Sequence, residues 1–365
     1  MMIPIAKPDI GQVEADLVNE VLNSGMLAQG PRTEQLEVDF ADYCGTKYAV
    51  AVNSGTAAIH AALYAAGVRE GDEVITVPFS FIATINPIIM LGAKPVFVDI
   101  NEGDYLMDVS QIESKITSKT KAILPVHLYG QIADMDVINT IAKKYKLAVI
   151  EDACQAIGAE YNGKKAGSLG AAGCFSLYAT KNIMCGEGGM ITTNDKNVAK
   201  IAKQFRQHGM SGPYQYEHIG YNYRTTDLCA AIAIAQLLKA DTFNSIRQKN
   251  ARLLSNKLQD IEGITLPNYD GGNSHVFHQY TLRIKDDIRD QFIERLRDAG
   301  VGAGVYYPKS LHTIPHVLSY GYSEGDFPIA EQACREVVSL PIHPSVSEVD
   351  IETISATVHE ILSNV

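Results

Sequence analysis

CFSLYATKNIMCGEGGMITTND, residues 174–195, is the most informative segment of this chain. Its apolar runs Cys174–Tyr178 and Met190–Thr193 predict two buried strands, and the glycines within residues 186–189 permit a tight turn before the second. Lys181 stands between the two runs, so its amine is expected at a strand end, where the core can direct it. A surface lysine is the ordinary alternative. Once burial or a nearby charge lowers its pKa, a lysine so placed can form a Schiff base with a carbonyl.

A second apolar strand places a carboxylate where the same ligand can meet it. Residues 148–159 read AVIEDACQAIGA, so this strand ends in Glu151 and Asp152. Open α/β sheets bind ligands at the carboxyl ends of their strands. The carbonyl that Lys181 implies is that of pyridoxal phosphate, whose ring nitrogen needs an acid. At ~4 Å and an effective dielectric of ~20, Asp152 would attract the protonated nitrogen by about 4 kcal/mol, enough to keep it protonated at neutral pH.

The phosphate and the ring of this cofactor need partners too. NSGTAAIHAAL, residues 53–63, turns through Gly55 and Thr56 into an alanine-rich helix, whose first N–H groups and dipole favour an anion. Simple capping of that helix by Ser54 is the alternative explanation. Phe81 follows a strand and is a candidate for stacking on the ring, although an aromatic residue at such a position is more often part of the core.

Taken together, these motifs resemble the DegT/DnrJ/EryC1/StrS family of sugar aminotransferases, which are pyridoxal-phosphate enzymes of fold type I. The resemblance extends over nearly the whole chain, and the set of motifs in this order is far more specific than any one of them. The segments that carry it are MLAQGPRTEQLE (26–37), SGTAAIH (54–60), PVFVDI (95–100), EDACQA (151–156), FSLYATKN (175–182) with GEGG (186–189), and GYNYRTTDLCAAI (220–232).

The family implies a role for each matching position. Lys181 would hold the cofactor covalently and, once released, carry the proton between the reacting carbons of cofactor and substrate. Asp152 would pair with the ring nitrogen, Gln155 would lie near the phenolic oxygen and Phe81 would stack on the ring. The other implied residues are Gly55, Thr56 and Ser176 for the phosphate, Asn222 for the phosphate bound by a neighbouring subunit, Arg224 for the carboxylate of the amino donor, and Tyr178 for the substrate.

Ordinary structural explanations exist for some of these residues. Gln155 could be a polar residue at a helix start, Ser176 a small strand residue, and Arg224 the partner in a surface ion pair. The role of Tyr178 depends most on the resemblance, because relatives carry other residues at that position.

The resemblance also implies the reaction. L-Glutamate would donate its amino group, and a keto group on a nucleotide-linked deoxysugar would accept it. The form GEGG favours amination at C4 over C3. An open groove between the subunits of a homodimer would hold the long acceptor, with residues 305–312 and 208–209 as candidate rim segments, or as ordinary surface loops.

Three other functions are compatible with the same fold. One is an aminotransferase that acts on a cyclitol or another cyclic ketone. A dehydratase of this fold would have histidine in place of Lys181, and the lysine is present. The third is a non-catalytic regulatory or binding protein, which would have no need of Lys181, Asp152 and Gln155 together.

Composition limits the remaining possibilities. The 365 residues are 46% hydrophobic and carry a formal charge of −11, which suits a large core and argues against nucleic acid or an anionic membrane as a partner. Six cysteines without C-x-x-C spacing indicate a reduced, cytoplasmic protein. No signal peptide is evident, and the longest apolar segment, residues 228–238, is too short to span a bilayer. The pairs His275/His278 and His312/His316 lack a zinc motif, so no metal is expected.

The order of the predicted elements indicates the architecture. Strand and helix patterns alternate through about residue 145, which is typical of a parallel sheet with helical cover. With the resemblance, this predicts an α/β protein of the aspartate-aminotransferase-like fold type I. A large pyridoxal-phosphate-binding domain with a mostly parallel mixed sheet is predicted at residues 1–245, and a smaller α+β domain at residues 246–365. Strands are expected at Tyr48–Val52, Glu73–Val77, Pro95–Ile100, Lys121–Val126, Leu147–Glu151 and His275–Ile284, and helices at Leu228–Leu238, Asp286–Ala299 and Ser347–Leu362, the last with a capping box of Ser345 and Glu348.

Overall fold

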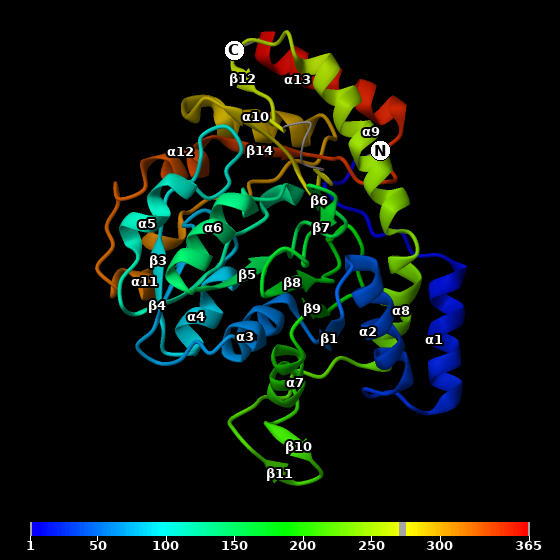
Figure 1. Cartoon of the computed structure of the whole chain (residues 1–365). Helices are drawn as coiled ribbons and strands as arrows, with labels where there is room; N and C mark the ends of the chain where they lie inside the picture. The colour runs from blue at the N-terminus through cyan, green and yellow to red at the C-terminus, as the bar shows by residue number, and fades with distance from the viewer. Residues whose placement is uncertain (1, 270–274, 364–365) are drawn as a thin grey trace.

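A seven-stranded sheet forms the centre of the molecule in the computed structural model, which describes residues 2–269 and 275–363 (Figure 1). The strand order is β1-β9-β8-β5-β4-β2-β3. The pairs from β8 to β3 are parallel, whereas β9 is antiparallel to both of its neighbours, so the sheet is mixed but mostly parallel, as expected. The strands are β1 (Tyr48–Val52), β2 (Glu73–Thr76), β3 (Lys94–Phe97), β4 (Thr120–Ile123), β5 (Ala148–Asp152), β8 (Ala172–Ser176) and β9 (Gly189–Thr193).

Helices cover both faces of this sheet (Figure 1). Successive side chains of a strand point to opposite faces, which explains why these apolar strands are buried on both sides. Val50 belongs to the apolar cluster that α3 and α7 cover, and its neighbour Ala51 to the cluster that α2 and α8 cover. The helices of the sheet are α2 (Pro31–Cys44), α3 (Gly55–Ala65), α4 (Asn86–Met90), α6 (Met135–Tyr145), α7 (Lys196–Phe205) and α8 (Asp227–Leu237).

Side-chain oxygens fix where two of these helices begin. The Ser54 hydroxyl accepts a hydrogen bond from the Ala57 N–H at 3.1 Å and caps α3, so the capping explanation of this segment is confirmed. The Asp227 carboxylate, at the start of α8, accepts from the N–H groups of Gly30 and Thr33 at 2.8 and 2.9 Å. This contact satisfies the free donors at the start of α2 and joins two motifs that lie far apart in the sequence.

The C-terminal part forms a smaller sheet of its own, with the order β12-β13-β14, packed against helices. The expected strand over residues 275–284 is too long, because β13 begins only at Tyr280. The preceding residues pair with the turn at residues 129–130 instead: the Val276 N–H donates to the Gly130 carbonyl at 3.0 Å. The elements here are α9 (Ala240–Leu258), β12 (Ile264–Thr265), β13 (Tyr280–Ile284), α10 (Asp286–Asp298), α12 (Pro328–Glu336), β14 (Val337–Leu340) and α13 (Glu348–Ser363).

The capping box of α13 is formed by different residues from those expected. The Ser347 hydroxyl accepts from the Asp350 N–H at 3.2 Å, and the Asp350 carboxylate accepts from the Ser347 N–H at 2.8 Å. The prediction of Ser345 and Glu348 was wrong by two residues, because the chain enters the helix later than the sequence pattern suggested.

Several short elements complete the chain. The predicted division near residue 245 stays a prediction, and α9 runs across that position. All six cysteines are free, four of them buried, and among the described residues no helix is long and apolar enough to cross a membrane. The remaining elements are the helix α1 (Gln12–Ser24) and the short elements α5 (Ile112–Lys115), α11 (Pro315–Leu318), β6 (Glu160–Tyr161), β7 (Lys164–Lys165), β10 (Met210–Gly212), β11 (Gln215–Tyr216) and the 3-10 turns η1 (Ile82–Thr84), η2 (Val109–Gln111), η3 (Leu128–Gly130) and η4 (Leu311–Thr313).

Candidate active site

A cavity of about 520 Å³ lies where the carboxyl ends of β5 and β8 meet the start of α3. This is the edge of the sheet at which open α/β folds bind their ligands. Most of the predicted site residues come together here, from segments spread over some 130 residues of sequence. The predicted residues that line the cavity are Gly55, Thr56, Phe81, Asp152, Gln155, Ser176, Tyr178 and Lys181.

Lys181 provides the only lysine amine among the described residues that line this cavity. Its backbone is anchored on both sides: its own N–H donates to the Tyr178 carbonyl at 2.9 Å, and the side chain of the next residue, Asn182, is buried and hydrogen-bonded. No salt bridge joins the half-buried ammonium group to any residue that the structure describes. Burial lowers the pKa of Lys181, while Cys154 and Asp152 act in the opposite direction. A lowered pKa gives the amine the nucleophilic form that carbonyl chemistry needs.

Asp152 ends β5 with its side chain directed into the cavity wall, where 5% of the residue is exposed. The Thr84 hydroxyl donates to Oδ2 at 2.7 Å, and the Cys154 N–H donates to Oδ1 at 3.3 Å. No lysine, arginine or histidine of the described chain forms a salt bridge with it. A buried carboxylate without a cation is unusual, so a positively charged group bound in the cavity would supply the missing counter-ion.

Glu151, one residue earlier on the strand, faces the opposite way and has a structural role. Its carboxylate accepts from the N–H groups of Gly167, Leu169 and Gly170 at 2.7, 2.8 and 2.7 Å. The alternation of the strand therefore separates a carboxylate that stabilises a loop from one that is directed to the cavity.

Gln155 is held between two segments far from it in sequence. Its Oε1 accepts from the Tyr129 N–H at 2.8 Å, and its Nε2 donates to the Tyr307 hydroxyl at 2.9 Å. Phe81, which is 54% exposed, lies over the same region with its ring centroid 5.9 Å from that of Tyr307. These contacts fix the amide and create an aromatic wall against which a flat ring can pack.

The opposite end of the cavity is narrow. A Cβ atom at Gly55 would lie 2.9 Å from the Ser176 Cβ and 3.0 Å from the Cys154 sulfur, so only glycine fits there without displacement. The N–H groups of the first turn of α3 begin at this point, beside the hydroxyls of Thr56 and Ser176. Such a helix start suits a phosphate.

Two predicted site residues do not join the cavity. Asn222 is exposed and Arg224 is half-buried, and neither lines it. The Asn222 carbonyl instead accepts from the Asn53 side chain at 3.4 Å. Within one chain these residues therefore contribute nothing to the site, and their roles stay predictions that require a second copy.

Other residues of the cavity were not singled out from the sequence. Tyr306 and Tyr307, which belong to one of the suggested rim segments, do line it. The groove between subunits stays a prediction. In the sequence, Thr84 carries no distinguishing signal, Glu187 counts only as part of the GEGG form, and His278 counts only as half of a metal-like pair.

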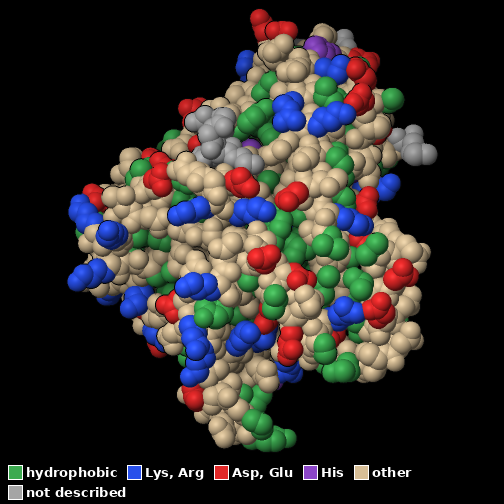
Figure 2. Space-filling model, turned by 45° about the vertical axis from the view of Figure 1, so that its right-hand side comes forward, with side chains coloured by type: hydrophobic (Ala, Val, Ile, Leu, Met, Phe, Trp, Pro, Cys, Tyr) green, Lys and Arg blue, Asp and Glu red, His purple; other side chains and the backbone are tan. Residues whose placement is uncertain are grey.

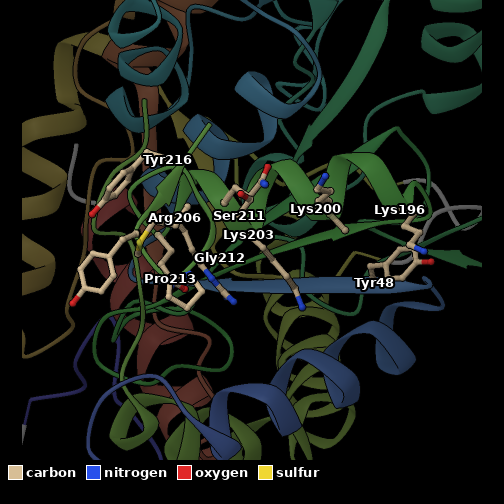
Figure 3. A pocket seen from close by; sticks show the side chains of 14 residues that line it. Tyr48, Lys196, Lys200, Lys203, Arg206, Ser211, Gly212, Pro213 and Tyr216 are labelled. Atoms are coloured by element: carbon tan, nitrogen blue, oxygen red, sulfur yellow. The ribbon is translucent and has the colours of Figure 1, made fainter. Parts of the chain in front are cut away.

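A second, larger hollow of about 870 Å³ lies between α7 and the β10–β11 hairpin (Figure 3). We call it the α7 groove. Its wall carries four cations and shares no residue with the Lys181 cavity. Among its lining residues are Tyr48, Lys196, Lys200, Lys203, Arg206 and Tyr216.

The family to which the chain belongs uses a cofactor that fits the residues of the cavity. The model of the DegT/DnrJ/EryC1/StrS aminotransferase family matches residues 8–359, so the chain belongs to that family. It is therefore a pyridoxal-phosphate-dependent aminotransferase of fold type I. Its unpaired Lys181, the buried Asp152 without a cation and the narrow end at Gly55 fit that cofactor.

Individual relatives carry different names. A protein of Geobacillus stearothermophilus named "Pleiotropic regulatory protein" is 44% identical over 94% of this chain and 91% of its own length. The UDP-2-acetamido-2-deoxy-3-oxo-D-glucuronate aminotransferase of Pseudomonas aeruginosa is 39% identical over 93% of each chain. The crystal structure of DesV from S. venezuelae, at 35% identity, covers 96% of this chain and 95% of its own with a TM-score of 0.93.

Proposed function

We propose that this protein transfers the amino group of L-glutamate to a keto group of a nucleotide-linked deoxysugar, at C4. The observation that carries the proposal is the lysine amine of lowered pKa that shares one cavity with a buried, unpaired carboxylate. The relative from Pseudomonas aeruginosa, whose name states a nucleotide-linked keto sugar, supports the class of acceptor. Its name places the keto group at C3, whereas the GEGG form favours C4, so both positions belong in the test.

Each residue of the cavity has a separate role in this proposal. When bound, pyridoxal phosphate supplies an electron sink. Lys181 would hold the cofactor and, when its amine is free, would take a proton from one carbon and return it to another. Asp152, which Thr84 fixes, would face the ring nitrogen. Gln155, which Tyr307 fixes, would lie beside the phenolic oxygen, and Phe81 would pack on the ring.

The remaining roles concern binding at the two ends of the site. Gly55, Thr56 and Ser176, with the start of α3, would hold the phosphate. Tyr178, which is 46% exposed and lines the cavity, would contact the substrate.

We further propose that the active form is a homodimer with shared sites. Asn222 and Arg224 lie outside the cavity of their own chain, and would complete the cavity of a second copy by binding phosphate and the donor carboxylate. Apolar side chains gather around the β10–β11 hairpin at the lower end of the molecule (Figure 2). Tyr214, in the turn of the hairpin, is 87% exposed, and Ile219, which follows β11, is 77% exposed. A second copy would bury this surface. The six free cysteines support a cytoplasmic location.

The first test is the visible absorption spectrum of the purified protein with pyridoxal phosphate, before and after addition of L-glutamate. We expect a band that glutamate removes and that Lys181→Ala lacks. The treated enzyme is then given UDP-, GDP- and TDP-linked sugars with the keto group at C3 or at C4, and the products are weighed by mass spectrometry. A gain of the amino group only with C3-keto sugars would overturn the position, and no product with any of them would overturn the sugar acceptor.

A regulatory function is the second candidate, because one relative is named a regulatory protein. A regulatory function predicts that glutamate leaves the visible absorption band of the protein with pyridoxal phosphate unchanged. A cyclitol acceptor is tested by adding scyllo-inosose to the same panel.

A further inference from the structure

His278 lies on the wall of the Lys181 cavity, and the proposed function gives it no role. Only 7% of the residue is exposed. The backbone on both sides of it is anchored to the turn at residues 129–130: Val276 donates to the Gly130 carbonyl at 3.0 Å, and Gln279 donates to the Tyr129 carbonyl at 3.3 Å. The ring therefore occupies one defined place in the cavity wall.

A chain of buried amides determines which ring nitrogen of His278 carries the proton. The Asn244 Nδ2 donates to the Ile157 carbonyl at 2.9 Å, so its Oδ1 is the atom that accepts from Asn182. The Asn182 Nδ2 donates both to that Oδ1 at 2.9 Å and to the Val276 carbonyl at 3.0 Å. The Asn182 Oδ1, which can only accept, lies 3.2 Å from the His278 Nδ1. The Nδ1 of His278 is therefore protonated.

The other ring nitrogen, Nε2, is then a hydrogen-bond acceptor. Burial, with the positive charges of Lys181 and Arg247, holds the pKa of His278 well below its usual value, so the ring is neutral at pH 7. None of the residues that the structure describes forms a hydrogen bond with Nε2. An acceptor of a cavity-lining residue that lacks a partner among the described residues is available to a group inside that cavity.

The donor that shares this space is the Lys181 amine, which belongs to the residue next to Asn182. We propose that His278 is a positioning residue: its Nε2 accepts a hydrogen bond from the Lys181 amine whenever that amine is not bound to the cofactor. The conformation described here has no hydrogen bond between these two side chains, and the four torsions of the lysine provide the reach. Asp152 and Cys154 also face the amine, and Arg247 also faces the imidazole.

This contact would orient the free amine. One N–H directed at His278 leaves the lone pair pointing away from the ring, toward the space that the reacting carbon occupies. The inference depends on the proposed role of Lys181, so its test uses cofactor-free protein and does not require transamination.

Two substitutions of His278 separate positioning from simple packing. His278→Asn keeps a donor near the place of Nδ1 for Asn182 and removes Nε2. His278→Gln loses that donor and can place its side-chain oxygen near the site of Nε2. The reactivity of the Lys181 amine with acetic anhydride is measured across pH, and the Lys181 peptide is quantified by mass spectrometry.

We expect the pKa of the Lys181 amine to fall by about one unit in His278→Asn, because an acceptor favours the protonated form of its donor. In His278→Gln it should recover at least half of that shift. A purely structural role predicts the reverse order, with His278→Gln the more disturbed variant, and that order would overturn the proposal. An unchanged profile in His278→Asn would overturn it as well.

His275 is the matched control, because it is also buried and does not line the cavity. Its Nδ1 accepts from the Phe277 N–H at 2.9 Å, and burial lowers its pKa to about 3, so its proton is on Nε2. His275→Asn should leave the Lys181 profile unchanged.

Histidine ¹H–¹⁵N correlation spectra of the unsubstituted protein provide a test that needs no variant to fold. At pH 7 they should show neutral His278 protonated at Nδ1 and neutral His275 protonated at Nε2, assigned through these two variants or through the backbone. A cationic His278, or one protonated at Nε2, would overturn the proposal. Neither the acetic anhydride reaction nor the ¹H–¹⁵N spectra include glutamate. The outcome of both measurements is therefore independent of whether the protein aminates a sugar.

Discussion

The Lys181 cavity and the α7 groove both contain lysine, but they differ in what surrounds the charge. The α7 groove is the larger, about 870 Å³ against 520 Å³. Two of its four cations share one buried partner, since Lys203 and Arg206 both form salt bridges with Glu37. In the cavity a single amine lies close to an unpaired carboxylate, and burial lowers its pKa. Size and charge therefore do not identify the reactive site, whereas a lysine and a buried carboxylate that line one cavity, neither in a salt bridge with a described residue, do.

The largest difference is expected when the same lysine substitution is made in both regions. Lys181→Ala removes the amine that we propose holds the cofactor and moves the proton, so the rate of amino transfer from glutamate should fall by at least about 10⁴-fold. Lys200→Ala, in the α7 groove, should retain the rate within about twofold, as an exposed substitution does. Steady-state kinetics with pyridoxal phosphate at saturation measure both. Comparable losses of rate in the two variants would show that the lysine of the cavity is no more important for the reaction than a lysine of the α7 groove.

A smaller loss is expected from the carboxylate. Asp152→Asn removes the charge that we propose faces the ring nitrogen and keeps the shape and the contact with Thr84. An attraction of about 4 kcal/mol corresponds to a rate lower by roughly a thousandfold. Glu217→Gln, on the segment beside the α7 groove, serves as the control. If Asp152→Asn keeps more than a tenth of the rate, the buried carboxylate does not have this role.

The paired charges of the α7 groove should affect stability and leave activity alone. Glu37 is 7% exposed, its carboxylate accepts from the Ala51 N–H at 3.1 Å, and it neutralises the buried Arg206. Glu37→Gln leaves that guanidinium without its partner, so the free energy of unfolding should fall by about 3 kcal/mol. Urea denaturation measures this change, and the rate per folded molecule should stay the same. Val38→Gln, at an exposed neighbour on α2, should alter neither value.

The smallest effect concerns the pH dependence of stability. Because the pKa of Lys181 is lowered by folding, the unfolded chain binds this proton more readily than the folded protein. The lysine therefore destabilises the fold at neutral pH, and the cost vanishes as the pH rises through the unfolded value of about 10.4. Lys181→Met in cofactor-free protein should raise the melting temperature by roughly 2 °C at pH 7 and by less at pH 10.5. Lys200→Met should show no such pH dependence; an equal rise in both variants would point to a general effect of removing charge.

Local patterns in the sequence were sufficient for most of the large sheet. Strands expected at Tyr48–Val52 and Leu147–Glu151 lie within one residue of β1 and β5, because apolar runs bounded by polar or glycine residues are typical of buried strands. The expected strand at residues 275–284 was too long. Its first half bonds to the turn at residues 129–130, a contact that no local pattern reports.

In the site, too, local patterns predicted some features, whereas contacts between distant segments could not be predicted. Lys181 and Asp152 were found because each follows an apolar strand, and eight of the predicted residues line one cavity. The partners that hold them were not found. Thr84 is 68 positions from Asp152, Tyr307 is 152 from Gln155, and His278 is 96 from Asn182.

Local patterns along the chain were enough to indicate the class of fold, the family, and Lys181 and Asp152 as candidate site residues, since hydrophobic periodicity and short motifs encode these features. Only folding brings together the amide and hydroxyl groups that fix Gln155 and Asp152, and only folding shows which nitrogen of His278 has no partner among the described residues. These depend on side chains that meet across the sheet, and the burial that changes their hydrogen bonding and pKa values exists only after the chain has folded.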